Sequence, residues 1–401
     1  MPTVLIITVF GIYFTHRSGY LPIIGMGRVL RSTVFARFGK KQSGTSPFAA
    51  AMAAIGGTVG VGSIAGMGFA IATGGAGSIF WMWICSITGM GLKYAEVKTA
   101  LGGGCGGTPY RLKALGKSRM SALFCVTCIL SSFGTGNLTQ QNAFSESAVS
   151  LGANRLIVAL SGALLVGIAV FGGKRRIIRI NARLVPIASA VYLITLVLLM
   201  LLLRDGLANA FLQIFEGAFG IKQLASGTAG AMIARSVREG FARSVFSNEA
   251  GLGCSTLAHS ESDGDSELQA RWGIFEIFFD TFIISTPTAV VLLASGATDC
   301  TAVFQAAFGD FGKMLFALLT AVFAFASVIS WCCYAEKCIT CLGGKRNALI
   351  AYRILSVAVA FIGATVSKSV IWELADILNA ILLIPNLFML FLCRKEIYKT
   401  E

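Results

Sequence analysis

Two glycine-rich runs interrupt apolar stretches of the chain and could build a polar site inside a hydrophobic protein. Residues 56–66 read GGTVGVGSIAG, and residues 246–253 read FSNEAGLG. Glycine adopts backbone conformations that other residues avoid, so a helix can unwind at such runs. An unwound helix exposes N–H groups to a carboxylate and C=O groups to a cation, and the half-helix N-terminus adds partial positive charge. The pattern therefore predicts a site for a small zwitterion and an accompanying cation.

The alternative interpretation of these glycines is close helix packing through small residues four positions apart. Two such pairs occur, Gly56/Gly60 and Gly62/Gly66. Packing does not explain why Asn248 and Glu249 lie in the middle of the second segment, because polar groups in a membrane are costly without partners or a function. We therefore favour broken helices.

Further polar side chains fall inside apolar segments. The acidic ones are Glu96, Glu276, Asp280, Glu336 and Asp376. Each of these alone is better explained as a packing or gating partner than as a substrate ligand. Other side chains that could reach a central site include Gln140 with its neighbours Gln141 and Asn142, Ser327 with Ser330, and Trp331, which lies deep in its segment.

The composition requires lipid around most of the chain. Of the 401 residues, 55% are hydrophobic and 13% charged, and the mean hydropathy is +0.76. Soluble domains carry roughly 25% charged residues, so the polar groups are too few for a water-exposed surface. Only helices or closed barrels satisfy their backbone in a bilayer, and the alternating pattern of barrel strands does not occur in the sequence. We predict an all-α polytopic membrane protein.

Eleven apolar segments are long enough to cross a bilayer, which takes about 20 residues. They cover residues 2–14, 47–73, 77–100, 119–150, 154–172, 183–204, 226–257, 270–295, 312–341, 347–366 and 370–393. The first is short and lacks a basic flank and a cleavage site, which favours a retained helix over a cleaved signal peptide.

Clusters of Lys and Arg follow the first, third, fifth, ninth and last segments. Loops of this kind stay in the cytoplasm, which predicts an N-terminus outside the cell membrane and a C-terminus in the cytoplasm. The net charge of +14 does not indicate nucleic-acid binding, because these residues form short runs between apolar segments rather than a basic face with interleaved aromatics.

When the first helix is set aside, the glycine-rich runs fall in core helices 1 and 6 of ten, at matching positions of two five-helix halves. This arrangement is typical of inverted-repeat transporters with a site at the bilayer midplane. A single transmembrane domain, residues 1–401, would then have four parts. These are 1–46, an extra helix and a basic cytoplasmic loop; 47–204, the first repeat; 205–225, an external amphipathic segment; and 226–401, the second repeat.

The cysteines and histidines argue against catalysis. Eleven cysteines include two CxxC pairs, Cys125/Cys128 and Cys338/Cys341, but there are only two histidines. No Cys/His zinc set is therefore expected, and we interpret the cysteines as small packing residues. A membrane enzyme is a weak hypothesis without a catalytic triad, and the paired broken helices favour alternating access over a channel.

At these motifs the sequence resembles the alanine/glycine:cation symporter family, also known as the sodium:alanine symporters. The most distinctive match is residues 246–253, followed by Ala258-His259. Further similar segments, in the same order along nearly the whole chain, are 80–83, 93–96, 136–142, 272–281, 323–325, 331, 375–379 and 384–387.

The resemblance implies a LeuT-type fold with eleven helices, and cotransport of L-alanine, glycine or a similar small neutral amino acid with Na⁺. By position, it places the substrate beside Val61, Gly62, Ser63, Gln140, Phe246, Asn248, Ser327 and Trp331. It places sodium where core helix 1 unwinds against core helix 8, with Gly57, Thr58, Gly60 and Ser327 as candidate ligands. We expect a monomer in the lipid bilayer.

The chain departs from the family pattern in core helix 1, where Gly-Thr-Gly-Asn is replaced by residues 60–63, Gly-Val-Gly-Ser. Val61 lacks a hydroxyl and Ser63 is shorter than asparagine. A missing partner for a buried polar group costs about 1–3 kcal/mol. The alternative hypothesis therefore keeps the fold but assigns another small solute, proton coupling or no coupling, or a sensor that does not transport.

Overall fold

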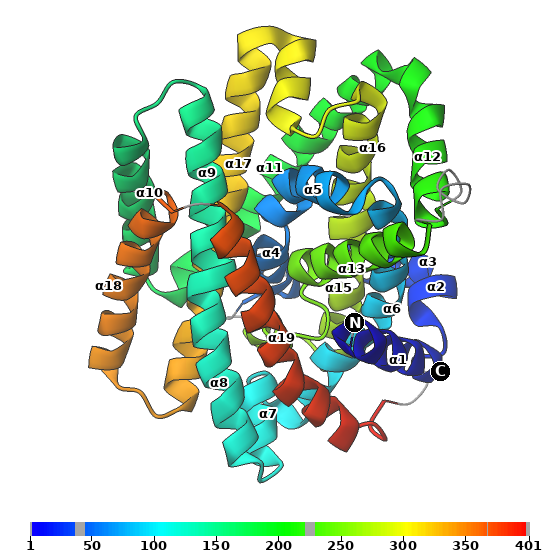
Figure 1. Ribbon diagram of the computed structural model, residues 1–401. Coiled ribbons are helices and arrows are strands. Elements are labelled where there is room, and N and C mark those ends of the chain that lie inside the picture. The colour runs from blue at the N-terminus through cyan, green and yellow to red at the C-terminus, as the bar shows by residue number, and fades with distance from the viewer. Residues whose placement is uncertain (1, 37–44, 221–228, 367, 398–401) are drawn as a thin grey trace.

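The computed structural model describes residues 2–36, 45–220, 229–366 and 368–397, and these residues are almost entirely helical (Figure 1). The first half contains α1 (Pro2–Arg17), α2 (Leu21–Ile24), α3 (Met26–Ser32), α4 (Pro47–Thr58), α5 (Val61–Gly74), α6 (Gly77–Leu101), η1 (Gly102–Gly104), α7 (Thr108–Ala114), α8 (Ser118–Phe133), the π-helical turn η2 (Gly134–Leu138), α9 (Thr139–Ser150), α10 (Arg155–Val170) and α11 (Lys174–Leu202). The second contains α12 (Arg204–Ala218), α13 (Ala229–Asn248), α14 (Thr256–His259), α15 (Ser266–Phe278), the π-helical turn η4 (Phe279–Ser285), α16 (Thr286–Ser295), α17 (Cys300–Cys341), α18 (Arg346–Gly363) and α19 (Lys368–Leu392). The all-α prediction is confirmed.

Seven helical stretches of the described chain are long and apolar enough to cross a membrane. Two shorter apolar helices, Val4–Arg17 and Arg155–Val170, accompany them. The count of eleven spans stays a prediction. Some predicted positions lie outside the described residues: 37–44 in the first basic loop, 221–225 of the amphipathic segment, 226–228 of the seventh apolar segment, and 398–401 at the C-terminus.

Both predicted helix breaks are present. In the first, α4 ends at Thr58 and α5 begins at Val61, which leaves only two residues outside the helices. The second extends from Glu249 to Ser255, and Glu249 has a φ of 54° in the left-handed region that glycine prefers. A local break therefore replaces continuous helix in both core helices 1 and 6.

The first break is shorter than its glycine run, because several of the glycines allow close packing within helices instead. A Cβ atom on Gly57 would lie 2.4 Å from the Tyr334 hydroxyl, and one on Gly56 would lie 2.9 Å from the Asn181 amide nitrogen. Close packing thus accounts for Gly56, which belongs to one of the two pairs named above, and for Gly57, while the break falls at residues 59–60.

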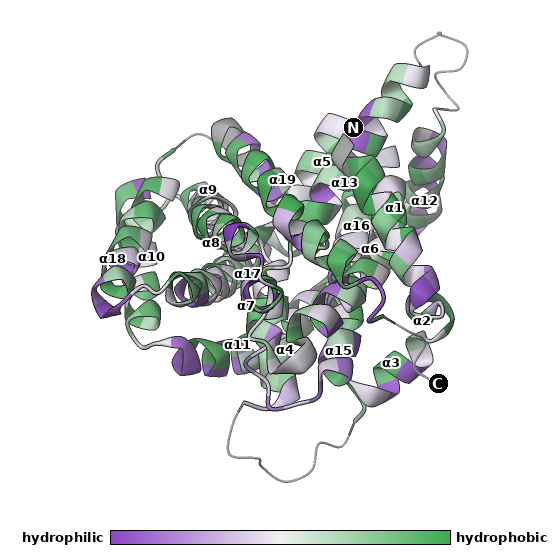
Figure 2. Cartoon of the chain, turned by 90° about the horizontal axis from the view of Figure 1, so that it is seen from below, coloured by the Kyte–Doolittle hydropathy of each residue, from purple (hydrophilic) through white to green (hydrophobic). Residues whose placement is uncertain are grey.

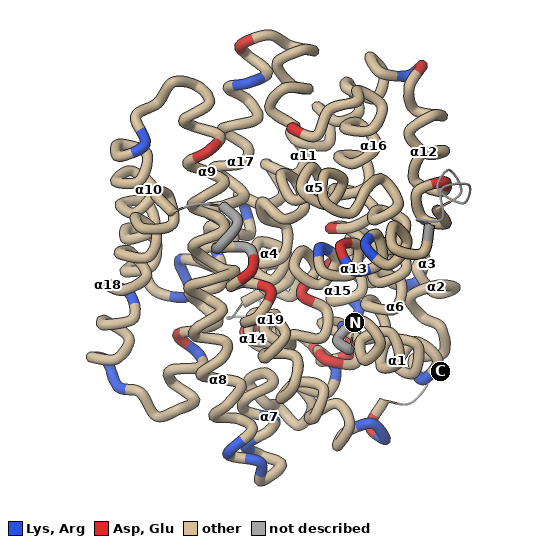
Figure 3. The backbone as a smooth tube through the Cα atoms, in the orientation of Figure 1, with Lys and Arg blue, Asp and Glu red and all other residues tan. Residues whose placement is uncertain are grey.

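Hydrophobic and charged residues are distributed as a bilayer requires. Large exposed hydrophobic side chains lie along α10, α11 and α18, for example Leu160, Ile187 and Ile354, and these outer helices are largely green in Figure 2. Acidic residues lie in the interior around α13, α14 and α19, whereas the lower ends of α7 and α8 carry Lys and Arg (Figure 3). The interior therefore holds polar groups that lipid would not tolerate.

Candidate functional site

The two helix breaks lie against each other in the middle of the protein, where α5 packs beside α13 (Figure 1). A Cβ atom on Gly62 would lie 2.8 Å from the Phe246 ring, so only glycine permits this approach. The hydroxyl oxygens of Ser63 and Ser247 are 2.9 Å apart. Residues 184 positions apart in the chain thus form one polar centre.

Asp280 occupies this centre from a third element, η4. Its carboxylate accepts hydrogen bonds from the Ser63 hydroxyl and, at 2.7 Å, from the Ser247 hydroxyl. All three side chains are buried, with at most 2% of their surface exposed. A π-helical turn adds a residue to the helix and is frequent at functional sites. Two hydroxyls and a carboxylate are hard oxygen donors of the kind that bind hard cations.

Gln140 of α9 covers the N-terminus of α5. Its side-chain oxygen accepts a hydrogen bond from the Val61 N–H at 3.1 Å, and its amide nitrogen donates to the Thr135 carbonyl at 3.3 Å. Helix N-termini bear partial positive charge and free N–H groups. A substrate carboxylate in this position could accept hydrogen bonds from the N–H groups at the start of α5, one of which now donates to Gln140.

Asn248 is directed toward α6, in contrast to the three residues at the centre. Its amide nitrogen donates to the hydroxyls of Ser86 and Ser244, at 3.1 and 2.9 Å. Its oxygen accepts from the Ala250 N–H at 3.0 Å, which closes the turn after α13. The side chain therefore holds the second break in shape.

Ser327 and the end of α4 come together as the sequence predicts for the cation. The Ser327 hydroxyl donates to the Gly57 carbonyl at 3.1 Å. The Thr58 hydroxyl turns back to its own helix and donates to the carbonyl of Ile55, at 3.1 Å. The Gly60 carbonyl accepts from the Ser63 N–H at 3.3 Å. Hydrogen bonds therefore join two pairs of these candidates, Ser327 with Gly57 and Gly60 with Thr58, whose carbonyl accepts from the Gly60 N–H at 2.9 Å.

Trp331 of α17 packs against η2 and against Tyr334 of its own helix. It is fully buried, and a Cβ atom on Gly136 of η2 would lie 2.4 Å from the Trp331 Cβ atom. The indole packs on Tyr334, with ring centroids 5.6 Å apart.

A buried ionic network supports the second break from below. The Lys93 ammonium lies 3.2 Å from the Glu276 carboxylate, 2.9 Å from the Ser255 hydroxyl and 3.5 Å from the Glu249 carbonyl. His259 bridges Glu276 and Gln269, at 3.1 and 2.7 Å. Asn386 of α19 donates to the Gly251 carbonyl at 2.8 Å and to Glu96 at 3.1 Å. The loop is thereby fixed by α6, α15 and α19 at once.

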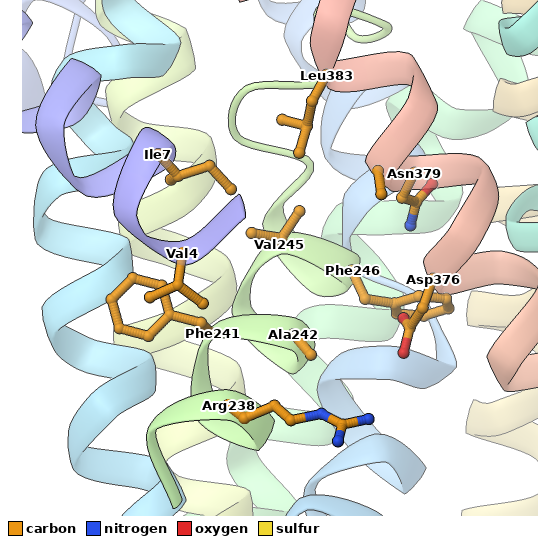
Figure 4. Close-up of a pocket in the computed structure, with 11 residues that line it drawn as sticks. Val4, Ile7, Arg238, Phe241, Ala242, Val245, Phe246, Asp376, Asn379 and Leu383 are labelled. Atoms are coloured by element: carbon orange, nitrogen blue, oxygen red, sulfur yellow. The ribbon is translucent and has the colours of Figure 1, made fainter. Parts of the chain in front are cut away.

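A cavity of about 200 Å³ lies beyond Phe246, between α1, α13 and α19 (Figure 4). Between it and the centre, Arg243 donates to the Asp376 carboxylate at 2.5 Å, and its guanidinium lies 5.4 Å from the Phe246 ring centroid. The Arg243 side chain is 3% exposed. Phe246 and Asp376 both line the cavity, and the Phe246 ring also meets Gly62 near the first break.

The structure thus brings Val61, Gly62, Ser63, Gln140 and Phe246 together where the two breaks meet. Ser327 and Gly57 contact each other near the end of α4, and Trp331 packs on η2. Sequence reasoning did not place Ser247 or Asp280 among the ligands. The signal was present, because Asp280 is an acid within an apolar segment. Neither hydropathy nor spacing reveals that it faces the two breaks.

Comparisons with known proteins agree with this architecture. The model of the sodium:alanine symporter family matches residues 1–400. The sodium/alanine symporter AgcS of Methanococcus maripaludis is 33% identical, over 95% of this chain and 89% of its own. A Bacillus subtilis protein named as a probable sodium/glutamine symporter, GlnT, is 30% identical, over 98% of this chain and 86% of its own.

A solved structure shares the fold at low sequence identity. The crystal structure of MhsT in complex with L-phenylalanine has a TM-score of 0.66 and 15% sequence identity, and the match covers 88% of this chain and 90% of that one. The predicted LeuT-type architecture is confirmed by this similarity. Since the family match spans the whole chain and the broken helices meet as such a transporter requires, the chain belongs to the sodium:alanine symporter family.

Proposed function

We propose that the protein is a secondary transporter that carries a small neutral amino acid, alanine or glycine, together with sodium across the cell membrane. The observation that supports this most strongly is the meeting of the two breaks, with the bare end of α5 and the group of Ser63, Ser247 and Asp280 in direct contact. The carboxylate of a zwitterion needs N–H donors, whereas its ammonium group and a bound cation need oxygen acceptors. This contact offers both kinds of group side by side.

The substrate carboxylate would bind the N–H groups at the start of α5 and replace the Gln140 oxygen there. Phe246 and Trp331, both buried, would close the space on two sides. Because Gly62 already contacts the Phe246 ring, the space favours a hydrogen or methyl side chain. The name of the relative AgcS, a sodium/alanine symporter, supports the same choice.

Sodium would bind at one or both of two positions. Asp280 offers a carboxylate with the hydroxyls of Ser63 and Ser247, and Ser327 with the Gly57 carbonyl offers neutral oxygens. Cation binding beside Asp280 would stabilise the contact of α5 with α13, since both donate ligands. A ligand shifts a conformational equilibrium only through such differential binding, so sodium would favour the state that also binds substrate.

In alternating access, the polar centre would open to the outer cavity in one state and to the opposite side of the membrane in the other. The Arg243–Asp376 pair links α13 to α19 over Phe246, so outward opening would break this pair. With the orientation predicted from the basic loops, the N-terminus is outside, the C-terminus is cytoplasmic, and the cavity faces outward. We propose that one chain performs the whole cycle.

Uptake of labelled alanine and glycine by proteoliposomes that contain the purified protein tests this proposal. Uptake is expected when an inward sodium gradient is imposed, and it is expected to fall when sodium is replaced by potassium or when the gradient is collapsed. Excess unlabelled alanine should compete with the label, whereas a large amino acid such as tryptophan should not.

Other results would support the alternative assignments. Uptake that follows a proton gradient and ignores sodium would indicate proton coupling. Amino-acid binding without uptake, measured as a thermal shift, would indicate a sensor. Neither uptake nor binding of any small amino acid would refute the proposal.

Replacement of Ser327 by alanine tests the second sodium position. Loss of one neutral oxygen ligand from a buried site costs about 1–3 kcal/mol, so the sodium concentration for half-maximal uptake is expected to rise about tenfold. The alanine concentration for half-maximal uptake at high sodium should change less. Sodium titration of initial uptake rates gives both values.

Ser330→Ala is a suitable control for this variant. Ser330 lies one turn further along α17 and donates to the Ala53 carbonyl at 2.7 Å, so its loss also removes a buried hydroxyl. It should leave the sodium dependence unchanged. Equal sodium shifts in both variants would mean that Ser327 acts through packing.

A further inference from the structure

A second groove lies on the exterior of the protein, between α1, α2 and α6 (Figure 1). It shares no lining residue with the cavity beyond Phe246. Its volume is about 560 Å³, within the range of about 300–1,000 Å³ that ligand pockets span. Its lining is mostly apolar and includes Val9, Ile12, Ile23 and Ile87. The groove is therefore large and apolar enough to hold a hydrocarbon chain.

Close packing of α1 on α6 brings two threonines into the groove. A Cβ atom on Gly11 would lie 2.7 Å from the Thr88 carbonyl oxygen, and one on Gly91 would lie 2.1 Å from the Thr15 hydroxyl. Thr15 and Thr88 both line the groove. Thr15 is 5% exposed, and its hydroxyl has no hydrogen-bond partner among the described residues. Because buried hydroxyls are normally paired, an oxygen atom of a ligand would satisfy this group.

Aromatic and basic side chains meet at one end of the groove, where the chain turns from α1 into α2. Gly19 and Tyr20 both have a φ in the left-handed region, 68° and 58°, which a tyrosine rarely adopts. The Tyr20 ring lies edge-on against His16, with ring centroids 5.5 Å apart. The Arg17 guanidinium lies 6.0 Å from the ring centroid of Tyr13. Tyr13, His16 and Tyr20 line the groove, so its apolar part ends in a polar one.

The sequence on both sides of this turn is basic and contains no acid. Residues 1–46 include no Asp or Glu, and their Lys and Arg residues are Arg17, Arg28, Arg31, Arg37, Lys40 and Lys41. Arg28 and Arg31 of α3 are exposed, and neither forms an ion pair within the part of the chain that the structure describes. Ile24 and Phe35 on the same segment are 76% and 72% exposed. Basic residues among exposed apolar ones are typical of a segment at a membrane surface.

We propose that this groove binds one anionic phospholipid of the bilayer, with an acyl chain between α1 and α6 and the phosphate near His16, Arg28 and Arg31. Clusters of basic residues at a membrane surface attract anionic lipids, and an arginine guanidinium matches the geometry of phosphate oxygens. A lipid bound in this way would hold α1 and α2 against α6. Because α6 also packs on α13, which carries part of the proposed transport site, the bound lipid would stabilise the folded transporter.

Native mass spectrometry on the purified full-length protein tests the proposal without a transport assay. The protein in detergent is incubated with equal amounts of phosphatidylglycerol and phosphatidylcholine that have the same acyl chains. We expect one phosphatidylglycerol per chain to remain bound in preference to phosphatidylcholine, and to raise the melting temperature. Inorganic phosphate should not displace it, because phosphate has no chain to fill the groove.

Two double variants test the contribution of charge. Arg28→Gln/Arg31→Gln should lower the preference for phosphatidylglycerol roughly tenfold or more, because it removes two cations that act on the headgroup. Arg175→Gln/Arg179→Gln is the matched control, since it removes two exposed arginines from the start of α11. This control should keep the preference of the unaltered protein.

A third variant tests the groove itself. Ile12→Trp puts a larger side chain into the groove and should weaken the retention of both lipids. All of the replaced side chains are exposed, so the melting temperatures without added lipid should stay close to that of the unaltered protein. Equal retention of the two lipids, displacement by inorganic phosphate, the same loss of preference in both double variants, or unchanged retention in Ile12→Trp would each overturn the proposal.

Discussion

Asp280→Asn is expected to abolish the stimulation of uptake by sodium at concentrations that saturate the unaltered protein. The substitution keeps the shape of the side chain and one acceptor for Ser63 or Ser247, but it removes the carboxylate charge that faces these two hydroxyls. Removal of one partner from a buried charge pair costs about 3–5 kcal/mol. At about 1.4 kcal/mol for each tenfold change, sodium affinity should fall roughly 100-fold or more.

Initial rates of alanine uptake at increasing sodium concentration measure this effect. Asp310→Asn is the matched control, because Asp310 is an exposed aspartate on α17 and has no part in the proposed site. It should retain the sodium dependence of the unaltered protein. If Asp280→Asn also retained it, the cation site would have to lie elsewhere, and Ser327 with Gly57 would be the remaining candidate.

Lys93→Met is expected to cause the largest loss of stability of any single substitution considered for this chain. The Lys93 ammonium is fully buried and lies among the carboxylates of Glu276, Glu96 and Glu249. Without it, these groups lose their shared cation in a region that water does not reach. Breaking a buried ion pair in this way costs about 3–5 kcal/mol, a large part of the roughly 5–15 kcal/mol that stabilises a typical domain.

The melting temperature in detergent and the yield of monodisperse protein report this loss. The double variant Lys93→Met/Glu276→Gln should melt higher than Lys93→Met alone, because it removes one of the stranded charges. With the single variant Glu276→Gln, the four proteins form a cycle that measures the coupling of the pair. Lys98→Met, on the same helix, is the control. Its partner Glu267 lies 3.0 Å away at a partly exposed position, where an ion pair contributes about 0–1 kcal/mol. Similar melting temperatures for Lys93→Met and Lys98→Met would contradict the importance of the network.

Local features of the sequence are sufficient to predict the membrane location, the helical fold and the two breaks. Hydrophobicity over a window of the sequence predicts where the chain crosses the lipid, and the glycine runs predict where a helix can open. Neither prediction requires knowledge of which helices pack against one another. The motif at residues 246–253 was sufficient to indicate the family. These properties depend on residues that are close together in the chain.

Other properties were decided only by the packing of distant segments. Asp280 and Asn248 both lie in apolar sequence, yet Asp280 faces the two breaks and Asn248 turns to α6. The sequence determines which residues share a helix face, but the rotation of that helix and the neighbour it meets depend on contacts along the whole chain. For this reason the composition and the glycine runs by themselves determined that the protein crosses a membrane with broken helices, and only the tertiary structure decided which side chains fill the gap between them.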